Sequence, residues 1–266
     1  MNGDLPLGRE VDYPDTYSPD VLVAVARQRD PSIENDALPF TGEDIWNAWE
    51  LTWLDPRGKP QIAAVELRVP ATSPNICESK SLKLYLNSFA MSEFPSSQHV
   101  QGTIASDLEG IVGSVVDVRF MNAGGEGAAI GNWPATCIDD VDIDVKHGEP
   151  AELRCDATQS VSEDLYSDLF RSLCPVTGQP DYASVRIRYD GPRLEHASLL
   201  RYLLSFRRHQ DFHEACVERI FLDLMEACRC ERLSVNARFL RRGGIDINPW
   251  RASYAASVPN GRLWRQ

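Results

Sequence analysis

Alternation of apolar and polar residues predicts strands in both halves of the chain, each followed by a segment of helical spacing. YASVRIRYD (182–190) alternates cleanly, and WELTWLD and QIAAVELRV flank the turn DPRGKP (55–60). In HEACVERIFLDLMEAC (213–228), apolar residues recur at the helical period. These are Val217, Ile220, Phe221 and Leu224. QHVQGTIASDLEGIVGS (98–114) occupies the equivalent place in the first half.

Two segments of the first half recur in the second. ESKSLKLYLNSF, from Glu78, and EHASLLRYLLSF, from Glu195, agree at seven of twelve positions. VDVRFMNAGG (116–125) and VNARFLRRGG (235–244) follow at nearly the same offset. Each copy therefore predicts strand, strand, helix region, strand, strand. This order indicates an α+β fold with antiparallel sheets and helices on one face.

The repeat also predicts the domain bounds. We expect an N-terminal extension at 1–40, a first module at 41–148 and a second module at 149–266, with the boundary near KHGEPAEL (146–153). The extension is rich in proline and acidic residues, which is typical of an arm.

The two copies differ in the polar residues that they carry. Only the first has lysines in its repeated segment, whereas only the second has FHE (212–214), Arg241 and Arg242 before its glycines, and the loop LCPVTGQPD (173–181). This complementary pattern predicts one site assembled from both copies. The alternative is ordinary drift on solvated faces.

Composition narrows the function classes for this chain of 266 residues. Its net charge of -12 disfavours direct binding of nucleic acid, although residues 193–242 hold ten arginines against seven carboxylates and could bind a small anion such as a nucleotide phosphate. No apolar run is long enough to span a bilayer, and the N-terminus lacks a secretory signal pattern. The seven cysteines are odd in number and irregularly spaced, which predicts reduced thiols in a cytoplasmic protein.

Four motifs, in order, resemble those of one family. ESKSLKLY, CPVTGQPD, FHE and RRGGIDINPW are similar to motifs of the QueF nitrile reductases, which convert 7-cyano-7-deazaguanine to 7-aminomethyl-7-deazaguanine in queuosine biosynthesis for tRNA modification. The resemblance runs from about residue 40 to about residue 255. It implies tandem ferredoxin-like modules of the tunnelling fold (T-fold), a small-molecule deazaguanine substrate, NADPH as cofactor and a homodimer.

The resemblance also assigns roles to individual residues. Cys174 matches the nucleophile that forms a thioimide with the nitrile carbon, and Asp181 matches the proton-transfer residue. Pro175 and Pro180 would restrict the loop between them. The matched substrate-binding residues are Cys77, Glu78, Ser79, His213 and Glu214. The matched cofactor-binding residues are Ser79, Lys80, Arg242 and Gly243, with Lys83 and Arg241 as weaker candidates.

Elementary chemistry agrees with these assignments, and each has a structural alternative. A carboxylate such as Glu214 can accept two neighbouring N–H groups of a deazaguanine. At a helix start, however, the same carboxylate can simply interact favourably with the positive end of the helix dipole. Lysine and arginine bind the phosphates of NADPH, but they also form ordinary solvated edges. A lone cysteine is most often a small buried apolar group, which is the interpretation kept for the other six cysteines.

Other functions remain open on the residues alone. The run AGGEGAAIG (123–131) lacks the third glycine and the helix of a dinucleotide loop, so a hairpin turn is expected there. A zinc-dependent tunnelling-fold enzyme would need clustered histidines, which the sequence does not offer, and Cys228 and Cys230 have no second pair to complete a metal site. A base-binding or redox-sensing protein without turnover is the non-enzymatic alternative.

Overall fold

The computed structural model describes residues 13–29, 38–121, 130–145 and 151–266, which form two compact units. Unit 1 holds the described residues of Met1–Gln28, Glu43–Ile130 and Arg241–Ile247. Unit 2 holds those of Arg29–Gly42, Gly131–Leu240 and Asn248–Gln266. The domain bounds expected from the repeat stay a prediction, and part of KHGEPAEL lies outside the described residues.

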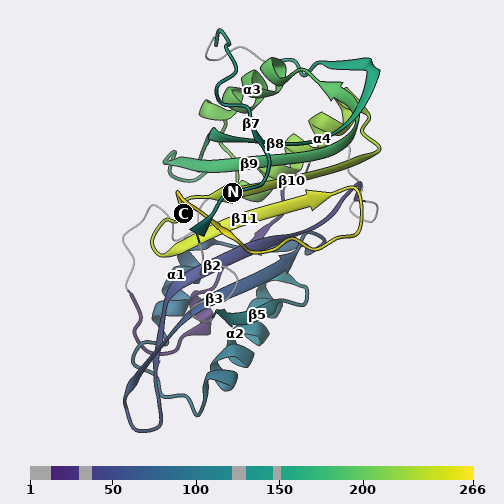
Figure 1. The fold of residues 1–266 in the computed structure, drawn as a ribbon. Coiled ribbons are helices and arrows are strands. Elements are labelled where there is room, and N and C mark those ends of the chain that lie inside the picture. Colours follow the sequence, from purple (N-terminus) through teal and green to yellow (C-terminus); the bar gives the residue numbers. More distant parts are fainter. Residues whose placement is uncertain (1–12, 30–37, 122–129, 146–150) are drawn as a thin grey trace. The chain divides into compact units, whose positions relative to one another are not determined.

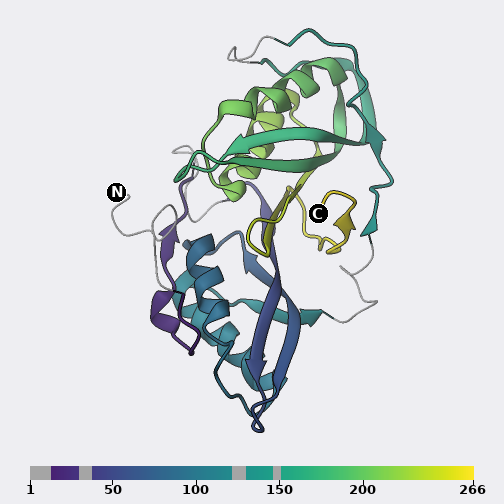
Figure 2. The same cartoon turned by 90° about the vertical axis from the view of Figure 1, so that its left-hand side faces the viewer.

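Unit 1 has a three-stranded antiparallel sheet in the order β5-β3-β2, with two helices against one face (Figure 2). Its core joins Trp46, Val65 and Leu67 of the strands to Tyr85 and Ile104 of the helices. A smaller sheet pairs β1 with β4. The elements are η1 Pro19–Val21, β1 Ala24–Ala26, β2 Thr41–Leu54, β3 Pro60–Pro70, β4 Asn75–Cys77, α1 Ser79–Asn87, α2 Ser97–Val112 and β5 Asp117–Met121.

Unit 2 repeats this arrangement with longer strands, in the order β11-β10-β9-β8-β7 (Figure 1). The strands pair antiparallel except for β7 and β8, which pair in parallel. The elements are β7 Thr136–Cys137, β8 Cys155–Leu173, β9 Pro180–Leu194, α3 His196–Ser205, η2 Phe206–Arg208, α4 His213–Cys228, β10 Arg232–Phe239, β11 Ile245–Ala252 and β12 Arg262–Leu263. Three of the described strands cross the unit boundaries: β2 begins in unit 2, β11 begins in unit 1, and β6 (Ile130–Gly131) has one residue in each unit.

The α+β class is confirmed, and so are the main elements. The helix predicted over 213–228 is α4, and its four apolar residues at helical spacing are fully buried. The helix predicted over 98–114 is α2, which ends at Val112 because Gly113 adopts the left-handed conformation. The repeated segments that begin at Glu78 and Glu195 form α1 and α3. The glycine run 123–131 lies mostly outside the described residues.

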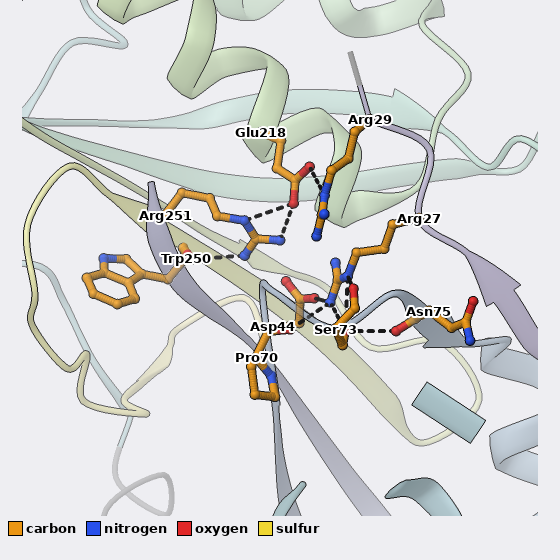
Figure 3. A network of polar contacts seen from close by, with 9 residues as sticks. All are labelled: Arg27, Arg29, Asp44, Pro70, Ser73, Asn75, Glu218, Trp250 and Arg251. Atoms are coloured by element: carbon orange, nitrogen blue, oxygen red, sulfur yellow. Dashed lines mark hydrogen bonds and ion pairs between the residues drawn. The ribbon is translucent and has the colours of Figure 1, made fainter. Parts of the chain in front are cut away.

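Residues 13–28 of the N-terminal extension pack against unit 1 and do not form a free arm. Tyr17 contacts the rings of Tyr85, Phe89 and Phe94, and its hydroxyl donates to Asp107 at 2.7 Å. Further along, Arg27 donates to the Asp44 carboxylate and to Ser73 (Figure 3). These contacts make residues 13–28 part of the first unit, whereas Arg29 and residues 38–40 belong to unit 2.

The expectation that all cysteines are reduced is wrong for one pair. Cys155 and Cys228 form a disulfide with their Cα atoms 5.8 Å apart. Cys155 begins β8 and Cys228 ends α4, so the pair meets only through the tertiary fold, which cysteine spacing does not reveal. The remaining cysteines, 77, 137, 174, 216 and 230, are free thiols. Across the described segments, no helix has the length and apolar character to cross a membrane.

Candidate active site

Cys174 lies in the tight loop of the β8–β9 hairpin in unit 2. The strands pair Leu173 with Pro180 and Ser172 with Asp181, so Cys174 and Asp181 stand at the same end of the hairpin. The Cys174 amide donates to the Gln179 carbonyl at 2.8 Å, and the Gly178 amide donates to the Cys174 carbonyl at 2.9 Å. Gly178 has φ +69°, a conformation that favours glycine. The loop therefore holds the backbone of Cys174 from both sides.

Two residues that the sequence singles out meet beside this hairpin. Asp181 is buried at the start of β9, and its Oδ2 lies 3.3 Å from Nε2 of His213, the first residue of α4. The His213 ring stacks on Phe239 with centroids 3.8 Å apart and planes 6° apart. Stacking and the contact with Asp181 together fix the ring orientation. This pair can hold or pass a proton close to the hairpin that carries Cys174.

The second nitrogen of His213 faces a different environment. Nδ1 is buried and has no hydrogen-bond partner within the described ranges of the chain. A buried polar atom of this kind is satisfied when a ligand supplies the missing group. His213 thus has one nitrogen at Asp181 and one available to a bound molecule.

Glu214 follows in the first turn of α4 and is 4% exposed. A carboxylate at a helix N-terminus is favoured by the helix dipole, as the sequence alternative proposed. Its burial next to His213 also places it where it could accept N–H groups of a ligand. The N-cap residue of α4 is Phe212, whose side chain accepts no hydrogen bond from the helix amides. Helix α4 therefore begins without a capping box.

The sequence analysis did not single out Phe239 or Cys216 for this site. Phe239 corresponds to Phe120 in the repeated segments VNARFLRRGG and VDVRFMNAGG, a signal that indicated only a core strand. Cys216, one turn into α4, is fully buried. Burial, reinforced by the nearby Asp211, Asp181 and Glu214 carboxylates, raises the pKa of the Cys216 thiol and keeps it protonated.

In unit 1, Cys77, Glu78, Ser79 and Lys80 lie where β4 turns into α1. The Glu78 carboxylate caps α1 by accepting from the amides of Lys80 at 3.0 Å and Ser81 at 2.7 Å. Its own amide donates to Val23 at 2.9 Å, so the N-terminal segment helps to position it. Burial raises the pKa of the Cys77 thiol to about 12, so this cysteine is protonated near neutral pH.

The glycine turn after β10 lies beside α1 in the same unit. Arg242 and Ile245 exchange backbone hydrogen bonds of 2.9 and 3.2 Å around Gly243 and Gly244. Gly243 has φ +58°, and a Cβ at this position would come within 2.8 Å of the Lys83 Nζ. Lys83 also lies 3.8 Å from the Glu50 carboxylate. The turn and the first helix therefore bring lysine and arginine residues together, with the Lys83 side chain packed against the Gly243 backbone.

The predicted residues thus form two groups. Cys174, Asp181, His213 and Glu214 lie in unit 2; Cys77, Glu78, Ser79, Lys80, Arg242 and Gly243 lie in unit 1. The assignment of each residue, and the expectation that one site uses both groups, stay predictions. The described residues hold no cluster of three or more histidine, cysteine or acidic side chains that could bind a metal ion.

Comparisons with known proteins cover almost the whole chain. Residues 13–120 match the family model described as "Nitrile reductase, 7-cyano-7-deazaguanine-reductase N-term", and residues 180–257 match the model "QueF-like protein". A protein of Azoarcus sp. (strain BH72), named NADPH-dependent 7-cyano-7-deazaguanine reductase, is 51% identical over 93% of this chain and 90% of its own length. A protein of the same name from Bordetella avium (strain 197N) is 48% identical over 96% of both chains.

Proposed function

Because the chain belongs to the 7-cyano-7-deazaguanine reductase family, we propose that it reduces the nitrile of 7-cyano-7-deazaguanine to the amine of 7-aminomethyl-7-deazaguanine with NADPH. The observation that carries the proposal is the grouping of Cys174, Asp181, His213 and Glu214 around one hairpin and one helix start. A nucleophile, a proton-transfer pair and a base-binding carboxylate are the groups that this reaction requires.

The first step is covalent. The Cys174 sulfur bonds to the nitrile carbon while one C≡N π pair moves to the nitrogen. The nitrogen takes a proton from the Asp181–His213 pair, which regains one from the Cys174 thiol, and the product is a thioimide. Cys77 and Cys216 are poor alternatives for the nucleophile, because burial raises the pKa of both thiols.

The residues of unit 1 fit NADPH. Lys80, Lys83 and Arg242 provide positive charge for its phosphates, and the absence of a side chain at Gly243 leaves room for the Lys83 side chain beside the turn. When bound, NADPH supplies the hydrides that reduce the carbon. Two hydrides and two protons convert the nitrile to the amine, and cleavage of the C–S bond returns Cys174 to a thiol.

The product implies a role in queuosine biosynthesis for tRNA modification, in the cytoplasm and without a direct nucleic-acid partner. A homodimer is the proposed assembly. The pathway, the location and the homodimer rest on the family resemblance, and the lack of a direct nucleic-acid partner rests on the acidic charge of the chain.

Turnover tests the function directly. With 7-cyano-7-deazaguanine added, we expect NADPH absorbance to fall by two equivalents per nitrile, because the reduction takes four electrons. The activity should resist a metal chelator. Dependence on added zinc would favour the cyclohydrolase-type alternative, and tight binding of the nitrile without NADPH loss would favour a base-binding protein.

Replacing Glu214 should separate substrate binding from cofactor binding. In Glu214→Gln we expect the dissociation constant for 7-cyano-7-deazaguanine to rise about tenfold or more, because a charge-assisted hydrogen bond is lost. The dissociation constant for NADPH should stay within about twofold. Glu226→Gln, an exposed position on the same helix, is the matched control. Equal weakening of both ligands would contradict the assignment of Glu214.

A further inference from the structure

One face of the unit 2 sheet is polar, and none of the candidate active-site residues described above lies on it. On β9 and β10 the residues Val185, Ile187, Leu233, Val235 and Ala237 are buried. The residues between them point to the other face and are polar: Arg186, Arg188, Asp190, Arg232, Ser234 and Asn236. Arg188 pairs in register with Ser234, and Arg186 pairs with Asn236, so these side chains are neighbours.

A cavity of about 400 Å³ opens on this polar face. The strands supply its floor, Trp250 of β11 adds to it, and the segment from Tyr254 to Pro259 forms another side. Its volume is within the range of small-molecule sites in proteins. All lining residues lie in unit 2, and none of them is part of the proposed nitrile reductase site.

The charges of this cavity are unequal. Arg186 forms two hydrogen bonds with the Asp164 carboxylate, at 2.7 and 2.5 Å, and is thereby neutralised. Arg232 lies over the ring of Tyr254 at 4.2 Å, and its Nε is 3.8 Å from Asp190. Arg188 is exposed and has no carboxylate partner in the portion of the chain that is described. Guanidinium groups outnumber carboxylates in the lining of this cavity, although the chain has a net charge of -12, and this local excess favours binding of an anion.

Asn236 adds a second requirement for the ligand. This side chain lines the cavity and is 6% exposed. Its Oδ1 accepts no hydrogen bond from the described residues. A buried carbonyl oxygen without a donor is unfavourable, and a ligand with an O–H or N–H group would satisfy it.

We propose that this cavity binds a phosphate monoester of mononucleotide size. Arg188 and Arg232 hold the phosphate, since both guanidinium groups lie on adjacent strands with at most a loose carboxylate contact. The Asn236 Oδ1 accepts a hydroxyl or amino group of the same molecule. A 7-deazaguanine base carries no phosphate, so this ligand differs from the proposed substrate.

Calorimetric titration of the full chain, without NADPH, tests the proposal. AMP and ribose 5-phosphate should bind saturably and more tightly than inorganic phosphate, and adenosine should not bind. Arg188→Gln should weaken AMP binding about tenfold or more, because a hydrogen bond to a charged group is lost. Asn236→Leu should reduce the advantage of the esters over inorganic phosphate.

Two control variants locate the binding. Arg229→Gln removes an exposed arginine elsewhere in unit 2, and Lys80→Gln changes the proposed cofactor site; neither should alter AMP binding. Loss of AMP binding in Lys80→Gln but not in Arg188→Gln would place the ligand at the cofactor site and overturn the proposal. So would the absence of saturable binding at millimolar AMP, or a changed oligomeric state in Arg188→Gln, which would make this face a contact between copies.

Discussion

Cys174→Ala is expected to abolish turnover and to leave the fold intact. Removing the nucleophile of a covalent mechanism lowers the rate by about 10⁴-fold or more, because the remaining groups only bind and orient the substrate. The buried position of Cys174 predicts a destabilisation of only about 1 kcal/mol for loss of one sulfur atom. NADPH consumption and thermal unfolding measure the two effects separately.

The covalent step has its own measurement. Wild-type protein mixed with 7-cyano-7-deazaguanine in the absence of NADPH should gain the full mass of the nitrile, because addition of a thiol expels no group. Cys174→Ala should show no adduct, whereas Cys137→Ala, which removes an exposed cysteine, should show it fully. An adduct that persists in Cys174→Ala would assign the chemistry to another residue.

Local patterns predicted the elements around Cys174 well. Helix α4 depends on a continuous apolar stripe, and β9 on a strict alternation, so each is determined by residues close in sequence. The motifs CPVTGQPD and FHE lie at the ends of these elements. The place of each motif is therefore set by a hairpin register or a helix start, whereas the contact between Asp181 and His213 also requires α4 to pack against the hairpin.

Contacts between distant segments could not be predicted in the same way. Three contacts join residues that are far apart in the sequence and are not related by helix or strand periodicity. They are the stacking of His213 on Phe239, the disulfide between Cys155 and Cys228, and the pairing of Ala24 with Cys77. Glu78 shows a different limit. Its motif favours a substrate contact, yet its carboxylate also caps α1, a role that depends on where the helix begins.

Buried arginine is a further feature that the sequence does not reveal, and in unit 2 it is the basis of a strong stability prediction. Arg251 is fully buried and donates to the Glu218 carboxylate at 3.0 and 2.7 Å and to the Trp250 carbonyl at 2.9 Å (Figure 3). Its guanidinium also lies 5.5 Å from the centre of the Phe40 ring. Arg29 stands 4.0 Å from the other oxygen of Glu218.

Arg251→Met should lower the free energy of unfolding by about 3–5 kcal/mol, because it leaves the buried Glu218 charge without its main partner. Urea denaturation followed by circular dichroism measures the change. The double variant Arg251→Met, Glu218→Leu removes both charges and should recover much of the loss, since apolar replacements of a buried ion pair are often neutral. A double variant as unstable as Arg251→Met alone would show that packing around the guanidinium, and not the uncompensated carboxylate, determines the stability of this region.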